Sequence, residues 1–285
     1  MSRIADHSTA KERYNWLGFG DPMIRPMTLP LVLLASCCAS LAQNATRETA
    51  PTPAQLAATT ARGRMLAEYD VAAWHATDAV EALKPDHAAA PLYLARKVGG
   101  KWEVVFGRLS LEKDKFLIVY RAAQGTTSEE FTVKKSDPPA EDRGFYFEAS
   151  RAIETASRDF GRPGRPYNNY VLPTEDGQFY VYFLPGQTKE DVYPLGGDVR
   201  YTVTLDGSTI VNKRQMHTTI IENKAALQPG QELAGGYHTH MLDNDVEDSD
   251  VFHVLTRSPL VPEIVGTPDK HVYEIETDGS IKRMK

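Results

Sequence analysis

Short apolar runs separated by glycine-containing turns fill most of the chain after residue 90. Two of these turns, Gly99-Gly100 and Asp206-Gly207, lie between runs rich in β-branched and aromatic residues. Two-residue turns of this kind join neighbouring antiparallel strands, because glycine adopts the positive φ that a tight hairpin requires. The pattern therefore predicts antiparallel sheets over much of the chain.

Three segments have helical character instead. Residues 54–83 are rich in alanine and end before Lys84-Pro85, and the apolar residues of 145–160 recur at the spacing of one helix face. A shorter helix is expected at 250–256. Helices alternating with runs of antiparallel strands predict an α+β fold.

The expected strands fall into two groups, separated by the turn-forming residues Ser136-Asp137-Pro138-Pro139. They cover 92–98, 102–109, 115–122 and 130–134 in the first group, and 167–172, 178–184, 199–205, 209–213, 235–240, 263–266 and 271–276 in the second. Residues 216–222 fit a short helix or a strand. We therefore expect a linker at 43–53, a smaller helix-plus-antiparallel-sheet region at 54–136, and a C-terminal domain at 137–285.

Residues 1–42 have the features of an export signal. The run 28–42 is apolar, follows Arg25, and is too short to span a membrane, and Met23 or Met27 is an alternative start. Leu34-Ala35-Ser36-Cys37 is similar to a lipoprotein signal, in which Cys37 is lipidated. These residues predict a bacterial lipoprotein of the periplasm or outer membrane, attached to the membrane only through its lipid. The alternative is secretion after cleavage at Ser40-Leu41-Ala42.

The charge of the chain bears on its partners. The formal net charge is −6, and no long block of lysine and arginine occurs. Nucleic-acid-binding proteins usually carry a basic patch or stripe. The composition therefore argues against nucleic acid as the partner.

The segment Gly235-Gly236-Tyr237-His238-Thr239-His240 contains the strongest candidate site. On a strand His238 and His240 point to the same side, and imidazole is the commonest metal ligand. Carboxylates follow between residues 243 and 250, and Asp250 is the preferred third ligand of a zinc ion. Asp248 and His253 are the alternate ligands, whereas nothing in the sequence places His217 at the pair.

Two other interpretations of the acidic residues are open. They form a solvated loop, or they bind calcium outside an EF-hand. The EF-hand pattern itself fails, because Asp248 stands at the sixth position and Val254 at the twelfth.

Tyr237-His238-Thr239-His240 and the acidic residues after it resemble the JAB/MPN (JAMM) metalloproteases. Their motif is His-x-His, seven residues, Ser, two residues and Asp. The resemblance covers roughly residues 140–285 and implies a cytidine-deaminase-like layered fold. The segment from Val265-Gly266-Thr267-Pro268 to Tyr273-Glu274-Ile275 is also similar to bacterial domains that contain a Tyr-His-Thr-His motif.

The resemblance implies that His238, His240 and Asp250 bind zinc and that the protein is a hydrolase. Its substrates would be peptide or isopeptide bonds in peptides or proteins of the cell envelope. Two features depart from the family: Ser249 and Asp250 are adjacent, and residues 167–172 lack the glutamate that acts as general base. The alternative is therefore a non-catalytic envelope lipoprotein or binding module that keeps the fold without activity.

Overall fold

The computed structural model describes residues 49–222 and 230–285. The expected export signal, the lipidation of Cys37 and most of the linker lie outside these ranges. The described part contains three helices, α1 (Pro53–Glu81), α2 (Phe145–Phe160) and α3 (Asp248–Thr256). None of the three combines the length and the apolar character that a membrane crossing requires.

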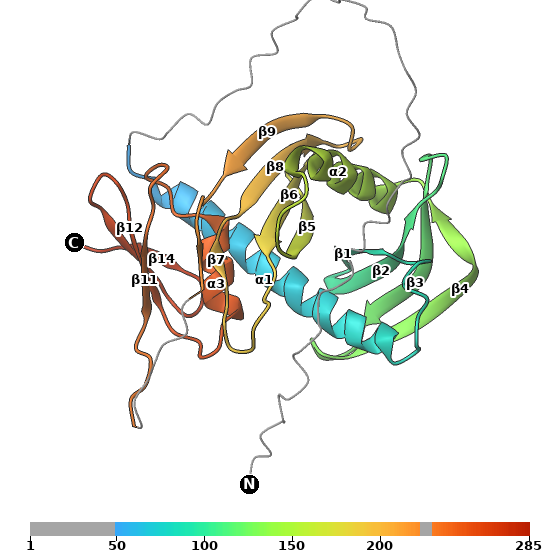
Figure 1. Ribbon diagram of the computed structural model, residues 1–285, viewed down its shortest axis with the longest axis horizontal. Helices are drawn as coiled ribbons and strands as arrows, with labels where there is room; N and C mark the ends of the chain where they lie inside the picture. The colour runs from blue at the N-terminus through green and yellow to red at the C-terminus, as the bar shows by residue number, and fades with distance from the viewer. Residues whose placement is uncertain (1–48, 223–229) are drawn as a thin grey trace, which may run out of the picture.

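The strands form three four-stranded sheets and one two-stranded pairing (Figure 1). The first sheet has the order β1-β2-β3-β4 and consists of β1 (Leu92–Val98), β2 (Lys101–Leu109), β3 (Phe116–Gln124) and β4 (Phe131–Asp142). The second has the order β5-β6-β8-β9 and consists of β5 (Tyr167–Pro173), β6 (Gln178–Pro185), β8 (Val199–Thr204) and β9 (Ile210–Gln215). Both sheets are antiparallel throughout, as the glycine turns predict.

The third sheet contains the histidine pair. It has the order β11-β12-β13-β14 and consists of β11 (Gly236–Thr239), β12 (Glu263–Gly266), β13 (Val272–Ile275) and β14 (Ile281–Arg283). Strands β11 and β12 are parallel and are joined through α3, whereas the other pairs are antiparallel. The short strands β7 (Leu195–Gly196) and β10 (Ile220–Ile221) pair with each other.

Helices α1 and α2 cover opposite faces of the first two sheets. Along β2, Val104 and Phe106 pack in the cluster that contains α1, while Val105 packs in the cluster that contains α2. Strand β6 alternates in the same way, with Tyr182 in the α1 cluster and Val181 in the α2 cluster. The two-residue period of a strand thus gives each sheet two apolar faces.

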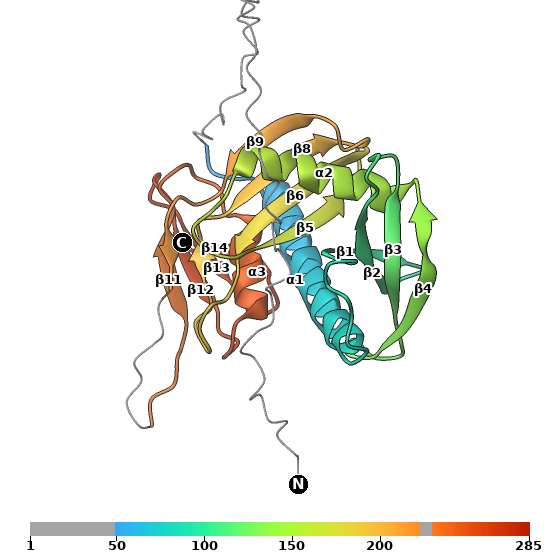
Figure 2. The same ribbon diagram turned by 45° about the vertical axis from the view of Figure 1, so that its right-hand side comes forward.

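Helix α1 also connects these sheets with the third one. Thr52 caps its first turn through a capping box with Gln55, and Pro53 occupies a first-turn position where its missing N–H costs nothing. From this end, beside β14, the helix passes α3 and continues along the β1–β4 sheet (Figure 2). A third apolar cluster joins α3 to β12 and β13 and includes Val251, Val254 and Tyr273.

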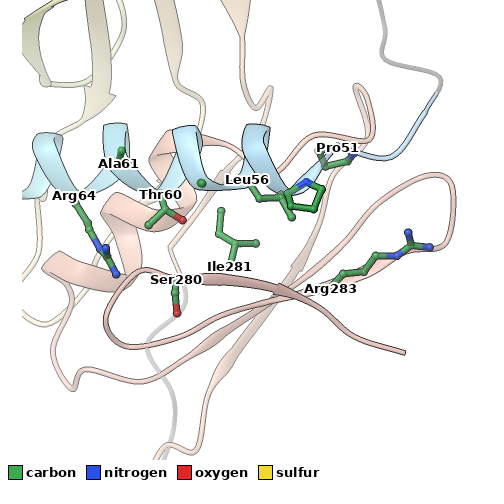
Figure 3. A pocket seen from close by; sticks show the side chains of 10 residues that line it. Pro51, Leu56, Thr60, Ala61, Arg64, Ser280, Ile281 and Arg283 are labelled. Carbon is green, nitrogen blue, oxygen red and sulfur yellow. The ribbon is translucent and has the colours of Figure 1, made fainter.

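A pocket lies between the first turns of α1 and β14. Leu56 and Ile281 lie on its two sides, Arg64 and Arg283 also line it, and its volume is about 560 Å³ (Figure 3). It contains none of the histidines or acids discussed below.

The mixed helix and antiparallel-sheet architecture confirms the expected class at this coarse level. The expected boundary after residue 136 falls inside β4, which continues to Asp142. Strands β7 and β14 were not expected, and residues 216–222 contain only the two-residue strand β10.

Candidate metal centre

Four side chains converge behind β11: those of His217, His238, His240 and Asp250. The Nε2 atom of His240 lies 2.9 Å from that of His217 and 3.1 Å from that of His238. The carboxylate oxygens of Asp250 lie 3.3 Å from Nε2 of His217 and 3.2 Å from Nε2 of each of the other two histidines. The four groups thus offer three nitrogens and one carboxylate around a single point.

Three parts of the chain supply these groups. His238 lies in β11 and His240 directly follows the strand, and the two-residue period places both imidazoles on the face covered by α3. Asp250 lies in the first turn of α3, in the connection between the parallel strands β11 and β12. His217 follows β9 by two residues and approaches from the second sheet.

Each imidazole is held by a hydrogen bond on its far side. Nδ1 of His217 lies 2.8 Å from Oδ1 of Asp198, and Nδ1 of His238 lies 2.9 Å from Oε1 of Glu263. Nδ1 of His240 lies 2.5 Å from the backbone carbonyl of Asp245. All three partners are acceptors, so in each neutral imidazole Nδ1 carries the proton and Nε2 presents a lone pair.

This arrangement is unfavourable without a cation. Three Nε2 lone pairs and a carboxylate, all acceptors, face one another inside the protein. The side chain of Asp250 is fully buried, and within the described residues its Oδ1 makes no hydrogen bond of good geometry. Buried acceptors without donors cost free energy, and a metal ion satisfies all four. The four groups fit a divalent metal ion in their chemistry and their positions.

Protons take the place of the cation in the metal-free protein. Burial lowers the pKa of His238, but the carboxylates of Asp250 and Glu263 outweigh it and raise this pKa to about 9. Burial also lowers the pKa of His217, and Asp198 and Asp250 likewise raise it well above its ordinary value. Burial raises the pKa of Asp250, and the three histidines hold it well below its ordinary value. The carboxylates thus keep positive charge at this point, as proton or as metal.

Two glycines allow the backbone to come close to these groups. A Cβ atom at Gly236 would lie 1.8 Å from Oε2 of Glu263, the residue that holds His238. Gly196 has a φ of 85°, and its Cβ atom would lie 2.3 Å from the carbonyl oxygen of Thr219 and 3.1 Å from Cβ of His217. A side chain at either position would move an imidazole or its acceptor, and the positive φ at Gly196 favours glycine independently.

The structure brings together the three preferred ligands, His238, His240 and Asp250, and adds His217. The alternates lie elsewhere. Asp248 accepts hydrogen bonds from Arg62, Arg200 and Tyr182. The side chain of His253, buried on α3, lies outside the group, and burial and Arg257 lower its pKa to about 4.

The two neighbouring glutamates are engaged in ion pairs. Glu263 binds His238 and Arg257, and Glu247 binds Arg214. Each therefore supports the centre from outside, and neither is positioned to accept a proton on the side where the four ligands meet.

Comparison of the chain with protein-family models, with curated proteins and with solved structures found no match.

Proposed function

We propose that this protein binds one divalent metal ion, zinc by the chemistry of its donors, through His217, His238, His240 and Asp250. Three imidazoles and a carboxylate are typical zinc ligands, and zinc prefers four of them in a tetrahedron. With bonds of about 2.0–2.1 Å to nitrogen, ligand atoms in such a tetrahedron lie about 3.3 Å apart. The two nitrogen–nitrogen separations of 2.9 and 3.1 Å, and the separations of 3.3 and 3.2 Å from Oδ1 of Asp250 to His217 and His238, are close to this value.

The single observation that carries the proposal is the orientation of the three imidazoles. Each Nδ1 donates to an outer acceptor, so that each Nε2 presents its lone pair to the same point. Outer hydrogen bonds of this kind are a regular feature of histidine metal ligands. A chance group of buried histidines would instead pair donors with acceptors among themselves.

Zinc titration of the full chain tests the proposal. We expect one zinc per chain in elemental analysis after dialysis, and a fall in affinity of more than about 100-fold in His240→Ala. The matched control is His87→Ala, a more exposed histidine outside the group, which should bind zinc like the wild type. A wild-type chain that retains no zinc after loading would overturn the proposal.

A second candidate function is metal-dependent hydrolysis of peptide or isopeptide bonds in the cell envelope, as the JAB/MPN resemblance implies. The observation that favours it is the residual opening at His217, which keeps 10% of its side-chain surface, against 0–3% for the other three ligands. Bound zinc would supply Lewis-acid activation of water or of a carbonyl oxygen. His238, His240 and Asp250 would then hold the ion, and the fourth position, on the side of His217, would be open to water or substrate.

A cleavage assay distinguishes metal binding alone from metal-dependent hydrolysis. A peptide library incubated with zinc-loaded protein should be cleaved if the hydrolase proposal is right, and His240→Ala should remove that activity. Stoichiometric zinc without any cleavage would leave the closed, non-catalytic centre as the function.

A further inference from the structure

We propose that Arg214 is the positioning residue of the metal centre, holding two of its four ligands through the loop between β11 and α3. This inference rests on the proposed metal binding. Arg214 belongs to β9, is three residues from His217, and keeps only 13% of its side-chain surface. Its guanidinium does not contact any of the four ligands directly, so Arg214 can position them only through other residues.

The guanidinium binds three acidic residues of the loop before α3, Asp243, Asp245 and Glu247. Nη2 of Arg214 lies 2.9 Å from Oδ2 of Asp243 and 3.1 Å from Oδ2 of Asp245, and it also contacts Oε1 of Glu247. Nε lies 2.9 and 3.2 Å from the two oxygens of Glu247. The planar guanidinium fork suits several carboxylates at once, and here it binds three of them.

The first connection to the centre passes through Asp245. Its side chain is held by Arg214, its backbone N–H donates to Oδ1 of Asp243 at 2.9 Å, and its backbone carbonyl accepts from Nδ1 of His240. Because the side chain and the backbone N–H of Asp245 are both held, its carbonyl has a fixed position. That carbonyl sets the ring orientation of His240 and keeps the proton on Nδ1. Loss of Arg214 would release this carbonyl.

The second connection passes through Glu247. This residue is the N-cap of α3, and its backbone N–H donates to Oδ2 of Asp250 at 2.8 Å in a capping box. Arg214 binds the Glu247 side chain in the same cap. The guanidinium therefore fixes the first turn of α3, and with it the position of the Asp250 carboxylate.

Charge and position predict opposite effects of removing Arg214. Coulomb repulsion alone predicts that zinc binds more tightly once the nearby positive charge of Arg214 is lost. A positioning role predicts weaker binding, because His240 and Asp250 lose their fixed orientations. Substitutions in outer residues of metal sites typically cost about 10–100-fold in affinity. The sign of the change thus separates the two roles.

The experiment compares Arg214→Gln and Arg214→Lys with the wild type, each as the full chain. Chelator competition measures zinc affinity, and the visible spectrum of the cobalt-substituted protein reports the geometry of the site. We expect about tenfold or greater weakening in Arg214→Gln and a smaller weakening in Arg214→Lys, which keeps the charge but not the fork. The tetrahedral cobalt bands should broaden or shift in both.

The matched control is Arg62→Gln. Arg62 binds Asp248, another buried carboxylate in the first turn of α3, which touches none of the four ligands. The zinc affinity and cobalt spectrum of Arg62→Gln should equal those of the wild type even if the thermal stability of this variant falls.

Equal or tighter zinc binding in Arg214→Gln, or an equal loss in Arg62→Gln, would overturn the role of Arg214 while leaving metal binding intact. Absence of zinc from the wild type would instead overturn the proposed function itself. If Arg214→Gln does not fold, Arg214→Lys carries the test, and an unchanged affinity and spectrum there would contradict the inference.

Discussion

The core between α1 and the first two sheets and the surroundings of β11 are both buried, but they contain opposite kinds of residue. The first is almost entirely apolar, with residues such as Leu66, Val104 and Phe106. The second buries Asp248, Asp250 and Glu263, along with other acids and histidines. Apolar burial stabilises a fold without further partners, whereas buried charge requires a specific partner for each group. The two regions should therefore respond differently to the same perturbations.

The largest expected effect is a truncation in the apolar core. Phe106→Ala removes a fully buried ring from β2 and should lower the free energy of unfolding by about 3–5 kcal/mol. The zinc affinity of the protein that remains folded should stay within about twofold, since that core lacks metal ligands. Denaturant titration and chelator competition measure the two quantities.

The control for this substitution is Leu111→Ala, because Leu111 is 88% exposed. It should leave both quantities unchanged. A tenfold loss of zinc affinity in Phe106→Ala would show that the two regions are not independent.

Zinc itself should act on the other region. A ligand present at 1,000 times its Kd stabilises the folded state by about 4 kcal/mol. We expect hydrogen exchange to slow mainly in β11, α3 and the end of β9, where the four ligands lie. Exchange measured with zinc and with a chelator would contradict this if protection rose equally in β1–β4.

As the pH rises from 6.5 to 9, the stability of the metal-free protein should fall, whereas its affinity for zinc should rise. In the metal-free protein His238 has a pKa of about 9, above its unfolded value of 6.5. Its contribution to stability, at most about 3 kcal/mol, is full below pH 6.5 and is lost as the pH rises through 9. Zinc must displace the same proton, so zinc affinity should rise over this range.

Thermal unfolding and zinc titration at several pH values test both slopes. Metal-free protein that gains stability from pH 6.5 to 9, or zinc affinity that is constant there, would contradict the charges assigned to the centre.

The smallest expected effect is the loss of one outer acceptor. Glu263→Gln keeps the size of the side chain that holds His238 and Arg257 but removes its charge. Zinc affinity should fall by about 10–100-fold. Glu276→Gln, which changes a glutamate that binds Lys282 at the surface, is the control and should have no effect.

Local patterns predicted most of the elements. Periodicity and glycine turns located all three helices and most strands within a few residues, because both signals depend on neighbouring residues alone. The short strands β7 and β14 were missed, since strands of two or three residues have no periodicity. The sequence also offered no sign that α1 would contact α3, a packing determined by the tertiary fold.

The sequence predicted those metal ligands that lie close to one another along the chain. His238, His240 and Asp250 lie within 13 residues of one another, and the strand period made the pair visible. His217 approaches from another sheet, so no spacing pointed to it. The Asp206-Gly207 hairpin pairs Val199 with Gln215, and this register brings Asp198 near His217, but it does not place either beside β11.

Which of Asp248 and Asp250 faces the imidazoles also depends on the side chains that surround each of them. Both lie in the first turn of α3, yet Asp248 faces Arg62 and Arg200 while Asp250 faces the imidazoles. Positions two residues apart on a helix point in different directions. Only the placement of the neighbouring arginines decides which carboxylate is available for metal.

X-ray absorption at the zinc edge of the zinc-loaded full chain tests the four-ligand centre most directly. The account predicts four nitrogen or oxygen ligands at about 2.0–2.1 Å, three of them with the scattering pattern of imidazole, and two imidazoles in His217→Ala. A wild-type spectrum with two imidazoles, unchanged by His217→Ala, would contradict it.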